Sequence, residues 1–299
     1  MYALRKFLFY ILAICTFLSS FTCFNGGTVV SANSSMPFYD LKPCDIVLRS
    51  KFFTSYATST VERKSNIALA VSAINNTFID VGGEFSFNKT VGVRTEKRGY
   101  KKAKIIVGGE FVDGVGGGVC QVSTTLYNAV LLAGLKITEF HPHSLPVHYV
   151  NPSFDAMVNS GSADLRFVND THNPIILRAI ADGTRLNIEI YGEPMEEVIT
   201  RHSVITEEIP ALPEEEILDS ASEYPDLYQG ERLVVRYGRA GYKSEGYLVR
   251  SKNGRTISTE KIRTDKYGAT RGLTVLGTAI RPLETPDERA SEGQTINIE

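Results

Sequence analysis

Residues 114–135, GVGGGVCQVSTTLYNAVLLAGL, carry the strongest structural signal in this chain of 299 residues. Three consecutive glycines (116–118) lead into a segment whose apolar residues recur at helical spacing, at Val122, Leu126, Ala129 and Ala133. This pattern predicts a helix that buries one face and ends near Gly134, with Cys120 at or just before its first residue. Free backbone N–H groups and the positive end of the helix dipole favour an anion there, so the pKa of a cysteine falls and its thiolate becomes a nucleophile. The glycines would let a substrate backbone approach closely.

The residues alone leave two structural interpretations of Cys120 open. A free cysteine is often a small buried residue at a helix start, with no chemical role. The second interpretation is a disulfide with Cys44, because Cys15 and Cys23 fall in the N-terminal apolar segment and leave two cysteines in the body of the chain. A body of this length can build its own core without such a bond, which favours a reactive thiol.

The N-terminus has the composition of an export signal. A basic start (Arg5, Lys6) precedes an apolar run (residues 7–18), and a small-residue triplet ends at Ala32. This order predicts a signal peptide over residues 1–32, and an uncleaved membrane anchor is the alternative. Either outcome predicts an extracellular protein that touches the membrane only through an uncleaved leader.

The charge balance argues against a nucleic-acid partner. The formal net charge is -2, and no zinc-finger or RNA-binding motif is present. No cofactor and no metal ion are expected.

The chain divides into segments of different composition. We expect an α+β domain with helices before an antiparallel sheet over residues 59–193 and a small elongated all-β module over 205–281. The other segments are the leader (1–32), two linkers (33–58 and 194–204) and a charged, disordered tail (282–299).

Within the first domain, local patterns predict one further helix and several strands. Thr60 can cap a helix that runs to Asn75. The segments with strand-like patterns are 85–93, 103–107, 145–149, 164–168, 175–179 and 186–191.

Histidines that could serve Cys120 as a base cluster in EFHPHSLPVHYV, residues 139–150. They are His141, His143 and His148. Pro142 favours an extended chain, which would place His141 and His143 on one face. A nucleophilic thiol needs such a base, and Asp155 or Asp164 could orient the imidazole. A zinc site made by the His-x-His pair and Cys120 is the alternative, but no fourth ligand motif accompanies them.

A basic cluster lies between the helices, at Arg94, Lys97, Arg98, Lys101, Lys102 and Lys104. Such a cluster is usually a solvated face. Its functional interpretation is contact with carboxylates or phosphates of a cell wall.

Several motifs in this order resemble the VanW domain, first named from vancomycin-resistance clusters of Gram-positive bacteria. They are FSFN, an Arg-Thr pair, GGGVCQVSTTLYNA and His-Ser-x-Pro-Val, all between residues 59 and 193. The C-terminal segment, with Gly230, Gly238, Gly241, Gly254 and Gly277, resembles the five-glycine module that often follows VanW domains. The chain departs from the family pattern at Ser153-Phe154, where Gly-Arg usually precedes Asp-Ala.

The resemblance implies an L,D-transpeptidase that crosslinks peptidoglycan stem peptides through a cysteine thioester. It implies Cys120 as nucleophile and His143 as base, with His141 as the alternate and Asp155 as the orienting acid. Substrate contacts are expected at Arg94, Gly117, Gly118, Gln121 and Ser144. The five-glycine module implies binding to peptidoglycan glycan. A non-catalytic wall-binding protein of the envelope or glycopeptide response is the alternative.

Overall fold

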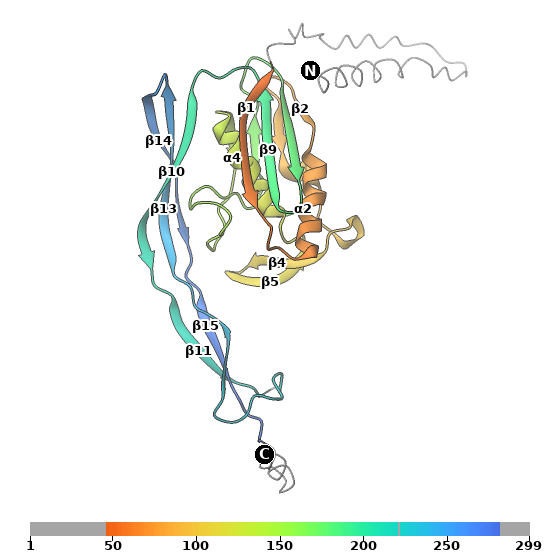
Figure 1. Ribbon diagram of the computed structural model, residues 1–299, viewed down its shortest axis with the longest axis vertical. Coiled ribbons are helices and arrows are strands. Elements are labelled where there is room, and N and C mark those ends of the chain that lie inside the picture. Colours follow the sequence, from red (N-terminus) through yellow and green to blue (C-terminus); the bar gives the residue numbers. More distant parts are fainter. Residues whose placement is uncertain (1–45, 221, 282–299) are drawn as a thin grey trace, which may run out of the picture. The chain divides into compact units, whose positions relative to one another are not determined.

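The structure is a computed structural model that describes residues 46–220 and 222–281 (Figure 1). The predicted leader, Cys44 and the predicted disordered tail lie outside the described residues. No helix within the described ranges has the length and apolar character needed to cross a membrane.

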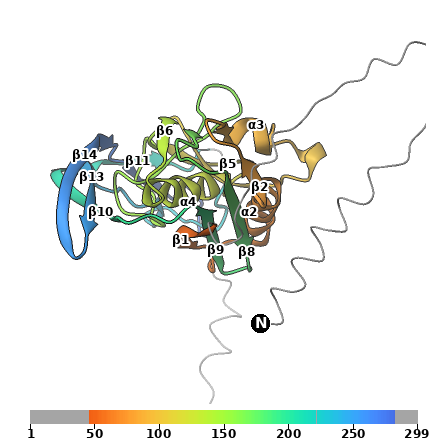
Figure 2. The same cartoon turned by 90° about the horizontal axis from the view of Figure 1, so that it is seen from above.

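The first part of the chain is built on a four-stranded antiparallel sheet. Its order is β1 (Val47–Ser55), β9 (Arg185–Gly192), β8 (Ile175–Ala181) and β2 (Thr77–Ile79). Two helices, α2 (Val61–Ile74) and α4 (Val119–Leu132), pack side by side against this sheet (Figures 1 and 2). Alternate side chains of β9 are buried beneath them, because successive residues of a strand face opposite sides.

Both predicted helices are confirmed. The Thr60 side chain accepts a hydrogen bond from the backbone N–H of Arg63 at 3.3 Å and caps α2. Helix α4 begins at Val119, so Cys120 is its second residue, and nearly every residue of this helix is buried. Its N-cap is Gly118, whose φ of 107° is a left-handed conformation that favours glycine.

The glycine loop before α4 is held by a buried asparagine of α2. Asn66 donates to the carbonyl oxygens of Lys101 and Gly117, both at 2.9 Å, and accepts from the Lys101 N–H at 2.8 Å. A Cβ on Gly117 would lie 2.7 Å from the Ala103 carbonyl carbon. Glycine is therefore needed there for packing.

Shorter elements surround this core. A three-stranded sheet has the order β3 (Glu84–Ser86), β7 (Arg166–Val168), β6 (Lys136–Glu139). The others are α3 (Phe87–Val91), the 3₁₀ helix η1 (Glu96–Arg98) and the hairpin β4 (Lys102–Val107) with β5 (Glu110–Val115).

The C-terminal module, as we call strands β10 to β15, contains two three-stranded sheets. One has the order β10 (Val198–Ile209), β13 (Gly241–Lys252), β14 (Arg255–Tyr267) and is antiparallel. The other has the order β11 (Leu212–Leu218), β15 (Arg271–Leu276), β12 (Arg232–Arg236), and its β11 and β15 are parallel. The predicted fold class, α+β followed by an all-β module, is confirmed.

The first sheet of the module shares its core with the helical part of the chain. Ile199 of β10 and Leu248 of β13, each 5% exposed, belong to the same hydrophobic cluster as α2 and α4. Arg201 of β10 also stacks over the rings of Phe52 and Phe154.

Two strands lie where the sequence predicts linkers. Strand β1 falls within residues 33–58, and β10 begins within residues 194–204. The inward positions of β1 include Ser50 and Thr54, which hydrogen-bond to Ala129 O and Thr125 of α4. Strand β1 therefore lacks the alternation of apolar residues that predicts a buried strand, although β1 is an integral strand of the sheet. The predicted domain boundaries stay predictions.

Two predicted strands are wrong in part or whole. Residues 87–91 form helix α3 because Ser86 caps it, accepting from the Lys89 N–H, and Phe87 and Val91 are buried one turn apart. Residues 145–149 form bends and irregular backbone, and Pro146 among them has no N–H to donate to a neighbouring strand.

Candidate active site

Cys120 lies in the first turn of α4, as the glycine pattern predicts. Its thiol is partly exposed and forms no disulfide within the described residues, which do not include Cys44, and its Sγ lies 3.3 Å from the carbonyl oxygen of Val158. The backbone N–H groups of Val119 and Gln121 already donate to Gly116 O and Gly118 O. An oxyanion held at this helix start would therefore depend on the amide of Cys120 itself rather than on a set of free N–H groups.

His143 lies between Cys120 and Asp155. Its Nδ1 is 2.7 Å from Asp155 Oδ2, and its backbone N–H donates to the same oxygen at 2.6 Å. The ring also lies close enough to the Cys120 thiol for each group to shift the pKa of the other. Because Nδ1 is engaged by the carboxylate, Nε2 is the nitrogen left for the thiol. Thiol, imidazole and carboxylate thus follow one another in space, and we call this series of three groups the contact chain.

The electrostatics of this chain favour an ion pair. Burial opposes a charged ring, but hydrogen bonds to Asp155 and Cys120 outweigh it and raise the pKa of His143 to about 9. Burial also opposes a thiolate, yet the hydrogen bond and charge of His143 lower the pKa of Cys120 below its usual value. A thiolate next to an imidazolium is the reactive form of a cysteine nucleophile.

Asp155 stays ionised although it is buried. Burial raises its pKa, while contacts with His143, Arg263 and Tyr267 lower it by more, so the net shift is downward. A buried carboxylate is stable when such donors satisfy it.

The structure separates the candidates that the sequence left open. Asp164 accepts from Ser86 Oγ at 2.5 Å and from the Asn88 N–H at 2.8 Å, so it anchors the start of α3. His141 contacts Glu139 at 3.0 Å, and His148 contacts Arg239 at 3.1 Å. His143 and Asp155 are therefore the pair beside Cys120.

The zinc alternative required His141 and His143 to converge on Cys120. His141 instead faces Glu139. Within the described part of the chain, no group of three or more His, Cys, Asp or Glu side chains is arranged to hold a metal ion.

Cys120 and His143 open into a cavity of about 760 Å³. Four of the five predicted substrate residues line it: Arg94, Gly118, Gln121 and Ser144. Gly117 does not line it and packs against Ala103 instead. The cations that border the cavity are Arg63, Arg94, Lys104 and Lys266. The cavity is thus suited to a ligand that carries carboxylates.

Arg94 and Gln121 line the cavity in different ways. Nη2 of Arg94 is buried and lacks a hydrogen-bond partner among the described residues. The Gln121 amide is fully bonded, since its Oε1 accepts from Arg63 and its Nε2 donates to Thr54 and Ser55 O. Gln121 therefore orients Arg63, and Arg94 keeps a free donor.

Sequence patterns missed the residues of β14 that reach Asp155. Arg263, Asp265 and Tyr267 are buried, while Thr264 and Lys266 between them are exposed. A polar alternation of this kind, Arg-x-Asp-x-Tyr, could have indicated a strand face turned toward a charged partner.

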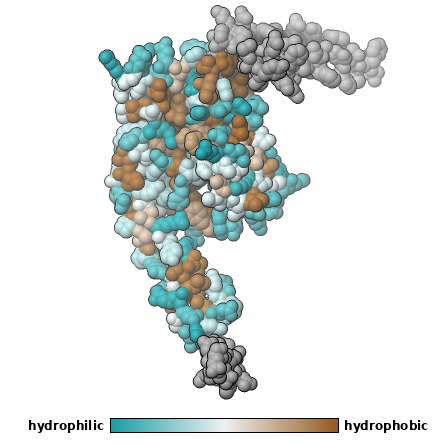
Figure 3. Space-filling view, viewed as in Figure 1, coloured by the Kyte–Doolittle hydropathy of each residue, from teal (hydrophilic) through white to brown (hydrophobic). Residues whose placement is uncertain are grey.

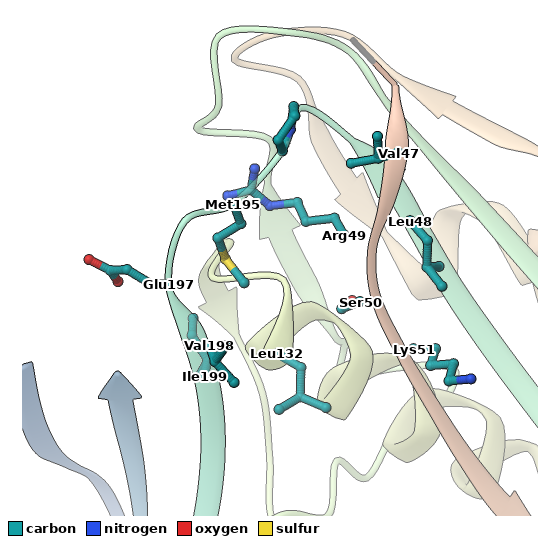
Figure 4. Close-up of a pocket in the computed structure, with 11 residues that line it drawn as sticks. Val47, Leu48, Arg49, Ser50, Lys51, Leu132, Met195, Glu197, Val198 and Ile199 are labelled. Carbon is teal, nitrogen blue, oxygen red and sulfur yellow. The ribbon is translucent and has the colours of Figure 1, made fainter. Parts of the chain in front are cut away.

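A second cavity lies apart from Cys120 (Figure 4). It has a volume of about 380 Å³ and is lined by parts of β1, β10 and the end of α4. Arg49 at its edge donates to Ala133 O and Glu193 O. No cysteine or histidine lines it, so the candidate chemistry belongs to the larger cavity.

Comparison with protein families gives two matches. Residues 62–191 match the family described as VanW like protein, and residues 200–279 match the G5 domain. The first match contains Cys120, His143 and Asp155, and the second contains Arg263 and Tyr267.

Two curated proteins each resemble a part of this chain. YoaR of Bacillus subtilis is 45% identical over 142 residues, which cover 48% of this chain and 47% of that protein. The vancomycin B-type resistance protein VanW of Enterococcus faecalis is 30% identical over 112 residues, covering 36% of this chain and 40% of that protein. The chain thus spans less than half the length of these relatives.

Two solved structures of G5 domains align with 28% of this chain. The IgA1 protease G5 domain is 24% identical over 92% of its length, with a TM-score of 0.19. HP0197-G5 is 20% identical over its full length, with a TM-score of 0.15.

Proposed function

Because this chain carries a VanW-like domain followed by a G5 domain, we propose that it is an exported, cell-wall-associated L,D-transpeptidase. The observation that supports the proposal most is the contact chain from Cys120 through His143 to Asp155. It lies inside the VanW-like match and opens into a cavity with several cations. We propose peptidoglycan stem peptides as substrates and glycan as the partner of the G5 domain.

The first half of the reaction is acylation of Cys120. The thiolate attacks the carbonyl carbon between the diamino acid and the terminal D-alanine of a tetrapeptide stem. A C–S bond forms, the C–N bond breaks, and the imidazolium of His143 gives its proton to the leaving amine. Asp155 holds the ring and stabilises its charge.

The second half transfers the acyl group to a neighbouring stem. A side-chain amine of that stem attacks the thioester and forms a new C–N bond. His143 takes the amine proton, the C–S bond breaks, and Cys120 leaves as a thiolate. The amide of Cys120 would donate to the oxyanion in both halves, and Arg94 would bind a stem carboxylate.

The test is release of D-alanine from a purified stem tetrapeptide, with an acceptor stem present. We expect the wild-type chain to release D-alanine and form a crosslinked dimer, and the Cys120→Ala variant to do neither. Equal release by both proteins would refute the role of Cys120. Release without a dimer would indicate that water is the acceptor and that the enzyme is a carboxypeptidase.

A covalent probe tests the same thiol independently. We expect incubation with a carbapenem to add one mass increment to the wild-type chain and none to Cys120→Ala. No adduct, together with an alkylation rate typical of an ordinary thiol, would favour the non-catalytic wall-binding protein.

A further inference from the structure

The two oxygens of Asp155 face different parts of the chain. Oδ2 accepts both hydrogen bonds from His143. Oδ1 accepts from the Tyr267 hydroxyl at 2.5 Å and from Arg263 Nη2 at 3.3 Å. Tyr267 and Arg263 belong to β14 of the C-terminal module. The carboxylate therefore joins the histidine to a strand more than 100 residues away.

Arg263 is held rigidly in this position. Its Nη1 donates to the backbone oxygen of Asp155 at 2.7 Å. Its Nε and Nη2 form a fork with Asp265, at 2.6 and 3.0 Å. Its guanidinium lies 4.8 Å from the ring centre of Phe140. A planar side chain fixed on every edge can define the place of a carboxylate.

The module also fixes the main chain on both sides of the histidine–aspartate pair. The Gly268 N–H donates to Ser144 O at 2.8 Å, next to His143. The Ser153 N–H donates to the Tyr267 hydroxyl at 2.9 Å, and the hydroxyls of Ser153 and Ser244 lie 2.7 Å apart. Both segments that carry the pair are thus bound to the same small sheet.

Strand β13, the neighbour of β14, approaches the backbone at Ser153 so closely that residue 246 must be a glycine. A Cβ on Gly246 of β13 would lie 2.9 Å from Ser153 O. Strand β13 therefore packs against the loop that carries Ser153 and Asp155. The side chains of β14 contact the same loop, at Asp155.

We propose that Arg263 and Tyr267 are positioning residues of the catalytic site, so that the C-terminal module completes the site and does not serve only to bind the wall. The proposal rests on the proposed function for its meaning in catalysis. The VanW-like domain supplies the thiol, the imidazole and the carboxylate. The module supplies the groups that hold the carboxylate against the imidazole, and thereby keep the thiolate ionised.

The test compares Tyr267→Phe with Tyr247→Phe in the full chain. Tyr267→Phe removes the hydroxyl that donates to Asp155 and accepts from the Ser153 N–H. Tyr247→Phe removes a hydroxyl of β13 that bonds to Glu245, away from the site. Three quantities are measured: the pH profile of Cys120 alkylation by peptide mass spectrometry, kcat and KM for D-alanine release, and the thermal unfolding midpoint.

For Tyr267→Phe, we expect the midpoint of the alkylation profile to rise by about one pH unit, because a less fixed carboxylate stabilises the imidazolium and thiolate less. We expect kcat to fall by about tenfold with KM within about twofold of wild type. Tyr247→Phe should match wild type in both measurements. A folded Tyr267→Phe protein with the wild-type profile and kcat would overturn the proposal.

The alkylation profile separates this proposal from the proposed function. If the wild-type chain releases no D-alanine but Tyr267→Phe still shifts the profile, the transpeptidase assignment fails and the positioning role stands. If Tyr267→Phe does not fold, Arg263→Lys decides the matter. This variant keeps the positive charge but loses the paired hydrogen bonds to Asp265, and we expect the midpoint of the alkylation profile to rise as well. An unchanged profile in that variant would overturn the proposal.

Discussion

The two sheets of the C-terminal module differ in what their side chains meet. The near sheet, β10–β13–β14, buries Ser244, Arg263, Asp265 and Tyr267. The far sheet, β11–β15–β12, leaves every residue of β11 exposed. Its Arg232–Glu216 ion pair is about half exposed on both sides. Apolar side chains also reach the surface of the described chain (Figure 3). Leu218 of the far sheet is 63% exposed.

This difference gives the two sheets of one module different surroundings. The near sheet is part of the interior that surrounds Asp155, where a lost donor leaves a buried charge unsatisfied. The far sheet has a solvated surface, where single charges contribute little to stability. In our proposal, the near sheet belongs to catalysis and the far sheet remains free to contact the wall.

The largest expected effect comes from two buried carboxylates, one beside each sheet. Asp155 contacts the near sheet, and Asp219 follows β11 and accepts from the N–H groups of Glu223 and Tyr224. We expect Asp155→Asn to lower D-alanine release by about a thousandfold, because the amide cannot stabilise the imidazolium. Asp219→Asn should leave the rate within about twofold of wild type, since it lies outside the contact chain. Equal losses in the two variants, both folded by circular dichroism, would erase the distinction between the sheets.

The next effect is the pH dependence of acylation. His143 has a pKa raised to about 9, so the imidazolium that protonates the leaving amine is present below that pH and lost above it. We expect initial rates of D-alanine release to fall above pH 9 by about tenfold per unit. The far-sheet variant Arg232→Gln should show the same fall in rate above pH 9. If the rate of the wild-type chain instead began to fall near pH 6.5, Asp155 and Cys120 would not hold the proton on His143.

The smallest effect concerns stability. Arg201 of the near sheet lies 4.3 Å from the ring centre of Phe52 and 4.7 Å from that of Phe154, and donates to Asn128. We expect Arg201→Met to lower the free energy of unfolding by about 2 kcal/mol. The matched far-sheet variant Arg232→Met should cost less than about 0.5 kcal/mol. Urea denaturation measures both, and similar losses would contradict the division of the module.

Local sequence rules located the candidate nucleophile, Cys120, at its helix start and predicted most of the elements around it. The glycines before Cys120 and the apolar spacing after it act within a few residues, so the helix start could be predicted. The same rules failed for β1, because Ser50 and Thr54 replace the apolar side chains that mark a buried strand. They also left His141 and His143 equivalent, since both flank Pro142 and only their distant partners differ.

By itself, the sequence determined that a cysteine opens a buried helix, that histidines follow it, and that an all-β module comes last. Only the tertiary structure placed the Asp155 carboxylate against His143 and brought Arg263 and Tyr267 to its other oxygen. The physical reason is that helix starts and strand alternation depend on neighbours in the chain, whereas a buried carboxylate is satisfied by whatever donors the fold brings to it. Here those donors come from a strand more than 100 residues further on.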